Sequence, residues 1–329
     1  MKTQKFYSLL LAMLITTCIS PLATSSKGDK IQPTLSAPTI STQTQSAPTI
    51  STTTPSSPKL ATITYIPLVV NNKTSTPVPP AGNGIIADHS VISVFPNIPT
   101  AVVKDAAAIK TLFMHQSTGG YIYESGLQCL AGVNGDPNYY PQECTQYAVN
   151  PPYDPYDDRN WNWKMWNTPM ANAPAKTDQW VSVVNTLQQD YQVLGMKFCY
   201  VDGWNQDFTY YRDNMLELER TYPNKVFIWS TSALWNDPGT ACQDNGFNSC
   251  MNIYEFNQQV RDYAKANHKF LYDIADIESD GGTCQVAGYE GLCAKYYSDG
   301  GGHPNITGSI RLAKGFWWLM ARISGWNGN

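Results

Sequence analysis

The chain has 329 residues and a net charge of -4, with only 22 Lys and Arg residues. Nucleic-acid binding depends on clustered basic side chains, so this composition excludes nucleic acid as an expected partner. The chain is rich in aromatic residues, with 20 Tyr and 10 Trp, and we expect most of them to fill the core.

The first residues follow the pattern of a secretion signal. Two lysines precede the apolar run Phe6–Ile15, and small polar residues follow it. This order is typical of a signal peptide, which we place at residues 1–25, and the run is too short for a membrane-spanning helix. We therefore expect a secreted or cell-surface protein without a transmembrane segment. A lipid anchor at Cys18 is the alternative, although a threonine precedes that cysteine where a smaller residue is usual.

Residues 26–80 are predicted to be a linker or stalk. They are rich in Ser, Thr and Pro, and one seven-residue sequence occurs at both 36–42 and 46–52. Such a segment cannot bury enough apolar surface to offset the entropy lost on ordering. Residues 60–70 alternate apolar side chains and could add an edge strand. We assign residues 81–329 to a single folded domain.

Strands and helices alternate along this domain. An alternation of this kind predicts a parallel sheet covered by helices on both faces, a three-layer α/β/α sandwich with a mostly parallel, flavodoxin-like sheet. Strands are predicted at 109–114, 196–201, 226–229 and 270–274, and helices at 177–191, 208–221, 254–267 and 307–324.

Polar motifs stand where the strands end. The first strand is followed by His-Gln-Ser-Thr-Gly-Gly at 115–120, the second by Asp-Gly-Trp-Asn at 202–205, and a glycine-rich loop places His303 just before the last helix. Ligands gather at the carboxyl ends of parallel strands. Ser117, Asn205 and His303 therefore form the parts of an acyl-transfer site, namely a nucleophile, an amide donor and a base.

These motifs resemble the SGNH/GDSL-type serine hydrolases, in particular an exported subgroup whose first motif is His-x-Ser-Thr-Gly. The similarity covers roughly residues 105–326, and its most specific element is Ser117 paired with the His-Pro-Asn-x-x-Gly sequence at 303–308. The resemblance implies that Ser117 is the nucleophile, His303 the base and Asp299 the acid. It places the oxyanion hole at the Ser117 amide, a glycine amide and Asn205.

Two features depart from the family pattern. The acid usually lies three residues before the histidine, whereas Asp299 lies four before it, so Asp280 is kept as an alternative. The glycine of the oxyanion hole is unassigned, because no glycine occurs from residue 136 to residue 194; Asn160 or Asn162 could contribute instead. We interpret His115 as structural.

Cysteine spacing independently favours export. Each of three close pairs brackets a short polar loop, where local closure is easy, and we predict a disulfide in each. The remaining cysteine of the domain, Cys199, lies in an apolar run and is predicted to be a buried thiol. The predicted pairs are Cys129 with Cys144, Cys242 with Cys250, and Cys284 with Cys293.

Residues 121–174 are predicted to form a long loop over the sheet, rich in aromatic and amide side chains. Trp161, Trp163 and Trp166 are candidate substrate-binding residues in this loop, because aromatic faces stack on sugars. The alternative is a cover that completes the core.

The sequence thus predicts an exported, monomeric serine esterase that hydrolyses an ester of a small molecule or polysaccharide, with no metal or cofactor. The competing hypothesis is a non-catalytic glycan-binding module on a cell-surface stalk. The retained serine and histidine favour the enzyme, whereas the missing glycine and the displaced acid favour the binding module.

Overall fold

The structure is a computed structural model. The predicted signal peptide and linker lie outside the residues it describes, as do Cys144 and Asp299. The described residues belong to one compact unit, and none of their helices has the length and apolar character that a membrane span requires. The described ranges are 84–133, 152–169, 171–236, 242, 249–298 and 302–328.

A six-stranded sheet forms the centre of the molecule, and every strand pair in it is parallel. The strand order is β1-β6-β5-β4-β2-β3, in which the last five strands have the flavodoxin-like arrangement and β1 extends the edge. The strands are β1 (Ile85–Ala87), β2 (Thr111–His115), β3 (Trp161–Met165), β4 (Val193–Met196), β5 (Val226–Ser230) and β6 (Phe270–Tyr272).

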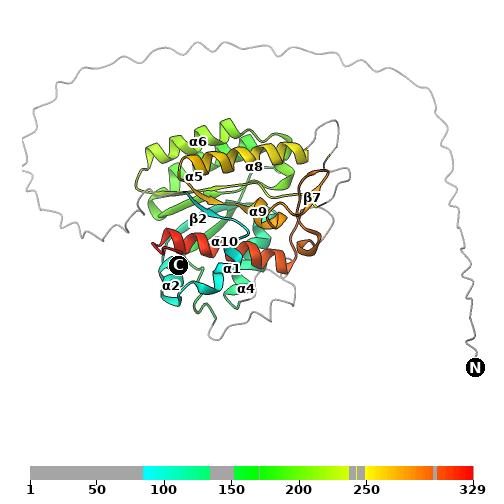
Figure 1. The fold of residues 1–329 in the computed structure, drawn as a ribbon. Coiled ribbons are helices and arrows are strands. Elements are labelled where there is room, and N and C mark those ends of the chain that lie inside the picture. The colour runs from blue at the N-terminus through cyan, green and yellow to red at the C-terminus, as the bar shows by residue number, and fades with distance from the viewer. Residues whose placement is uncertain are drawn as a thin grey trace, which may run out of the picture. The chain divides into compact units, whose positions relative to one another are not determined.

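Helices cover both faces of this sheet, as Figure 1 shows, so the predicted three-layer α/β/α architecture is confirmed. One layer contains α5 (Ala173–Leu187), α6 (Phe208–Thr221) and α8 (Ser249–Ala266). The other contains α1 (Val91–Val94), α2 (Thr100–Ala107), α4 (Gln128–Leu130) and α10 (Ile306–Ile323).

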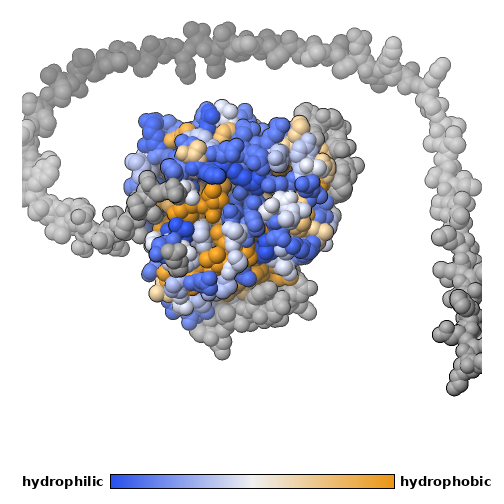
Figure 2. Space-filling model, viewed as in Figure 1, coloured by the Kyte–Doolittle hydropathy of each residue, from blue (hydrophilic) through white to orange (hydrophobic). Residues whose placement is uncertain are grey.

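Side-chain alternation along β2 divides the core in two. Leu112 and Met114 pack into the cluster under α5, α6 and α8, whereas Phe113 packs against Phe316 of α10 at 5.4 Å between ring centroids. This is the period-two pattern of a central strand. The face seen in Figure 2 is largely hydrophilic, with one hydrophobic band between the two helical layers.

The predicted elements recur with shifted bounds. The 208–221 helix coincides with α6. The strand predicted at 196–201 was wrong beyond its first residue, because β4 ends at Met196 and residues 200–204 form a short helix, and β6 is followed closely by α9 (Ile274–Ser279). The strands β1 and β3 and the short N-terminal helices were not predicted. A small antiparallel hairpin also follows α9, formed by β7 (Gln285–Val286) and β8 (Tyr289–Glu290).

Two of the predicted disulfides are present, Cys242–Cys250 and Cys284–Cys293. Cys129 is also disulfide-bonded, and its predicted partner lies outside the described residues. Cys199 is a free, buried thiol as expected, although it follows β4 instead of lying within a strand.

Candidate active site

Ser117 stands two residues beyond the carboxyl end of β2, immediately before a helical run that begins with α3 (Thr118–Gly120). Its φ of 52° is unusual for a residue with a side chain, which indicates that the surrounding contacts enforce this sharp turn. A helix amino terminus favours nearby negative charge, so the turn places the serine where an oxyanion would be stabilised. Gly119 is required here, because a Cβ at this position would lie 2.3 Å from the His115 side chain.

His303 is far from Ser117 in the sequence but contacts it in the fold. Its Nε2 lies 2.5 Å from Ser117 Oγ, across 186 residues of sequence. Ser298 holds the histidine loop, because its N–H and Oγ both donate to the His303 carbonyl at 3.1 Å. With the ring proton on Nδ1, Nε2 accepts the serine proton, which is the contact a general base needs.

Asn305 connects this loop to α10. Its side-chain oxygen accepts a hydrogen bond from Gly308 N–H at 3.0 Å and so caps the helix, while its Nδ2 donates to the carbonyls of Lys295 and Tyr297. The His-Pro-Asn motif is thus both a helix start and the support for the histidine.

Two tyrosines surround the His303 ring, and sequence reasoning predicted neither. Tyr121 stacks on the imidazole with 4.8 Å between ring centroids. The Tyr200 hydroxyl lies 3.3 Å from His303 Nε2, and Trp235 contacts the Tyr200 ring edge-on at 4.3 Å. The positions of both tyrosines, shortly after β2 and β4, are the only signal that the sequence offered.

Asn205 ends the short helix η5 (Tyr200–Trp204) after β4. Its Oδ1 accepts a hydrogen bond from Ala173 N–H at 3.0 Å, which fixes the amide and directs Nδ2 away from that contact. Asp202 stabilises the same turn. It is fully buried, and both its carboxylate oxygens accept hydrogen bonds from Lys176 Nζ, at 2.8 and 2.7 Å. Asn205 does not cap α6, because that role belongs to Asp207.

Ala171 lies in the loop between β3 and α5 with a φ of 59°, a conformation that normally favours glycine. The next two backbone N–H groups donate to Asp202 and Asn205, so this loop is tied directly to the turn after β4. An alanine in a left-handed conformation leaves no glycine signal in the sequence.

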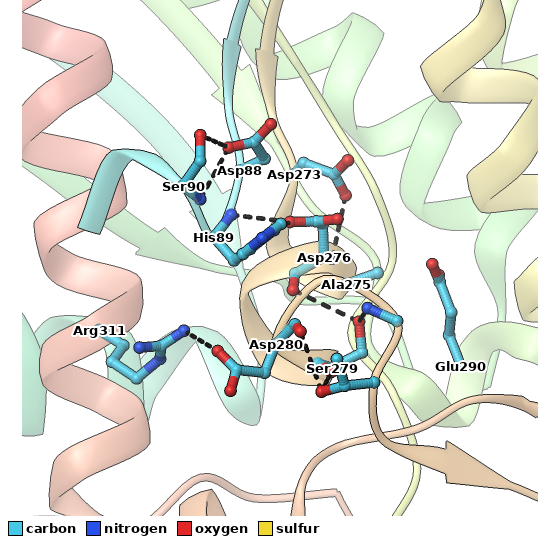
Figure 3. Close-up of polar contacts among 12 residues, drawn as sticks. Asp88, His89, Ser90, Asp273, Ala275, Asp276, Ser279, Asp280, Glu290 and Arg311 are labelled. Carbon is cyan, nitrogen blue, oxygen red and sulfur yellow. Dashed lines mark hydrogen bonds and ion pairs between the residues drawn. The ribbon is translucent and has the colours of Figure 1, made fainter. Parts of the chain in front are cut away.

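Asp280, the alternative acid, is already engaged. Its two oxygens bind Arg311 at 2.7 Å and Lys295 at 2.6 Å, as Figure 3 shows for the arginine. The hydrogen bond from Lys295, reinforced by the charge of Arg311, holds the pKa of this carboxyl below its usual range. Asp280 is therefore a surface ion-pair residue, and Asp299 lies outside the described residues.

A separate polar group lies at the ends of β1 and β6. Within the described part of the chain, Asp88, His89 and Asp276 are the residues whose ligand atoms come close enough, within 4.8 Å, to hold a metal ion (Figure 3). His89 Nδ1 lies 2.5 Å from Asp276 Oδ1, and this pair joins the segment after β1 to α9. The strands β6, β5 and β4 separate the group from β2, so it is not part of the serine site.

The structure corrects the expectation that Trp161, Trp163 and Trp166 contact substrate. They are only 3, 8 and 5 % exposed. Trp161 packs on Trp317 of α10, and all three rings belong to the core clusters. Their faces are therefore occupied by core side chains, which was the alternative for this region.

The two candidate asparagines also have other partners. Asn160 precedes β3, at the amino edge of the sheet, and donates to the Ala107 carbonyl at 2.9 Å. Asn162 donates to the Tyr191 hydroxyl at 2.6 Å. Ser117 stands at the carboxyl edge, so the sheet separates Asn160 from the nucleophile.

Comparison with known proteins gives similarity in fold. No protein-family model matches the chain, and no curated protein matches it. A proposed acylhydrolase from Bacteroides fragilis is 11 % identical, with a TM-score of 0.44 over 71 % of this chain and 95 % of that one. A GDSL-like lipase from Bacteroides thetaiotaomicron is 12 % identical (TM-score 0.40, 69 % and 94 %), and an acetylxylan esterase from Geobacillus stearothermophilus is 13 % identical (0.38, 67 % and 96 %).

These structural neighbours, an acylhydrolase, a GDSL-like lipase and an acetylxylan esterase, are similar to the chain at low identity. The chain itself is an α/β/α protein with a hydrogen-bonded serine and histidine at the carboxyl edge of a parallel sheet.

Proposed function

We propose that this protein is an exported serine esterase that forms a covalent acyl-enzyme on Ser117. The observation that carries the proposal is the 2.5 Å contact between Ser117 Oγ and His303 Nε2, made by two residues at opposite ends of the domain. A strained nucleophile turn at the start of a helix supports the same reaction. The disulfides favour an oxidising compartment, in agreement with export.

In the proposed reaction, His303 Nε2 takes the Ser117 hydroxyl proton as Oγ bonds to the ester carbonyl carbon. The carbonyl oxygen becomes an oxyanion, to which the Ser117 N–H and Asn205 Nδ2 donate. When the carbon–oxygen bond to the alcohol breaks, Nε2–H gives its proton to the leaving oxygen. Water then releases the acid by the reverse sequence. In this proposal Asp299 orients His303, and the substrate is an ester of a small molecule or of a polysaccharide.

A fluorophosphonate probe tests the nucleophile without knowledge of the substrate. The purified protein should be labelled at Ser117, and Ser117→Ala and His303→Ala should each lower turnover of a small acetyl ester by about three to six orders of magnitude. Asn205→Ala should lower it by about 100-fold to 1000-fold if its amide binds the oxyanion. Asp299→Ala should cost less than His303→Ala, because it acts through the histidine.

The matched control is Ser93→Ala, which removes an exposed serine hydroxyl from α1 and should leave labelling and turnover unchanged. If the wild-type protein neither reacts with the probe nor cleaves esters, the proposed esterase function is wrong. Binding of glycans by such an inactive protein would establish the competing binding module.

A further inference from the structure

Two hydroxyl groups lie near the same nitrogen. Ser117 Oγ is 2.5 Å from His303 Nε2 and Tyr200 Oη is 3.3 Å from it. A neutral imidazole nitrogen has one lone pair and accepts one hydrogen bond well. In the free protein the closer hydroxyl, that of Ser117, donates its hydrogen bond to this lone pair. The tyrosine hydroxyl is held beside the same nitrogen at the longer distance.

Tyr200 is fixed in this position by its surroundings. The side chain is 7 % exposed, and its ring lies so close to the backbone of Gly302 that a Cβ there would come within 2.3 Å of it. Trp235 closes the other side of the ring, and the buried Lys176–Asp202 ion pair anchors the turn that carries Tyr200. The hydroxyl therefore cannot move far from His303 without displacing core contacts.

We propose that Tyr200 is a positioning residue for the second half of the reaction, in which its hydroxyl holds the water that hydrolyses the acyl-enzyme. This inference rests on the proposed esterase function. Once Ser117 Oγ is part of the acyl ester, it has no proton to donate to His303. The attacking water must then lie within hydrogen-bonding distance of Nε2, and Tyr200 Oη is a fixed hydrogen-bonding partner beside that nitrogen.

The protons balance without any transfer from the tyrosine. The water oxygen bonds to the acyl carbon as Nε2 takes one water proton. The bond from carbon to Ser117 Oγ then breaks, and Nε2–H returns its proton to Oγ. Tyr200 keeps its own proton throughout and contributes only a hydrogen bond that orients the water.

The test compares acylation with deacylation in Tyr200→Phe, which keeps the ring and removes the hydroxyl. After a pulse of p-nitrophenyl acetate, intact-mass measurement follows the decay of the acetyl-enzyme. We expect this decay to slow by about 10-fold to 100-fold, the range for loss of one well-placed hydrogen bond. The rates of acylation and of fluorophosphonate labelling should stay within about threefold of wild type. In steady state kcat and KM should fall together, with kcat/KM nearly unchanged.

The matched control is Tyr222→Phe, which removes a hydroxyl that lies at the end of α6 and donates to Asn185 of α5, and should leave every rate unchanged. Unchanged acetyl-enzyme decay in Tyr200→Phe would overturn the inference. An equal loss of labelling and of decay would also overturn it, because the hydroxyl would then merely support His303. If wild type forms no acyl-enzyme at all, the proposed function itself fails, which is a distinct result.

Discussion

His115 and Ser117 are two residues apart, yet they lie in opposite environments. The serine is half-buried at the site, whereas His115 is 3 % exposed and its ring lies 5.5 Å from that of Trp163. Burial lowers the pKa of His115 to about 3, and the nearby Lys197 reinforces this effect. His115 is therefore neutral at physiological pH, and its burial fits a structural role.

This buried histidine should make the protein acid-sensitive. In the unfolded chain His115 takes up a proton below its ordinary pKa of 6.5, whereas in the fold it stays neutral down to about 3. The unfolded state therefore binds more protons over this range, and stability should fall as the pH decreases from 6.5 towards 3. Between pH 6.5 and 4.5 this group alone should cost about 2 kcal/mol.

Urea unfolding of wild type and His115→Gln at pH 7 and pH 4.5 measures this contribution. The variant is expected to be less stable at pH 7 but to lose about 2–3 kcal/mol less between the two pH values. His268→Gln, which replaces an exposed histidine, should show the wild-type pH dependence. An equally steep loss in His115→Gln would show that other groups cause the acid sensitivity.

At the scale of elements, the sequence predicted what depends on local pattern. Ser117 and His303 could be placed because each stands at a clear boundary, after a buried strand and before an amphipathic helix. The strand β3 also had a local signal, since Trp161 and Trp163 alternate with Asn162 and Lys164. Aromatic residues with period two face the core from a strand, but they also resemble a stacking surface.

Tyr200 could not be assigned from the sequence. Its position depends on the close approach of Gly302 and Trp235, residues that are 102 and 35 positions away by their numbering. The φ of Ala171 likewise results from tertiary contacts, with no glycine to mark it. Long-range contacts of this kind leave no periodic pattern in the sequence, so residues such as Tyr200 and Ala171 can be assigned to the site only from the folded structure.

The Cys284–Cys293 disulfide is connected to Tyr200 through Trp235. Leu292, next to Cys293, donates its N–H to the Trp235 carbonyl at 2.8 Å, and Trp235 in turn packs on Tyr200. The bridge closes a loop in the segment that leads to His303. Disturbance of this loop should therefore reach the histidine through Trp235 and Tyr200.

We expect Cys284→Ala/Cys293→Ala to lower kcat about tenfold and the free energy of unfolding by about 2–3 kcal/mol. The matched control, Cys242→Ala/Cys250→Ala, removes a bridge of similar loop length and should cost similar stability with a smaller loss of kcat. Kinetics and urea unfolding of the two double variants make the comparison. Equal losses of kcat would mean that the Cys284–Cys293 bridge has no special connection to the site.

At the scale of the whole molecule, the site depends on closure of the entire fold. Ser117 follows the second strand of the described chain and His303 precedes its last helix, so the pair forms only when α10 has docked on the sheet. The described fold begins with β1, which pairs with β6, and the buried Ala87 and the His89–Asp276 pair fix this edge. Among the described residues, the elements that position the site run from β1 to α10.

Removal of residues 26–80 should therefore leave the folded domain intact. Their Ser, Thr and Pro composition offers little apolar surface, so we expect the Tm to change by no more than about 2 °C and ester turnover to stay at the wild-type value.

Removal of residues 26–90 is the matched comparison, because it also deletes β1 and His89. That longer deletion should lower the Tm by about 5 °C or more, since it exposes the edge of β6. Calorimetry and an acetyl-ester assay compare the two. A large loss from the shorter deletion would instead place residues 60–70 within the domain, as the edge strand that their apolar alternation allows.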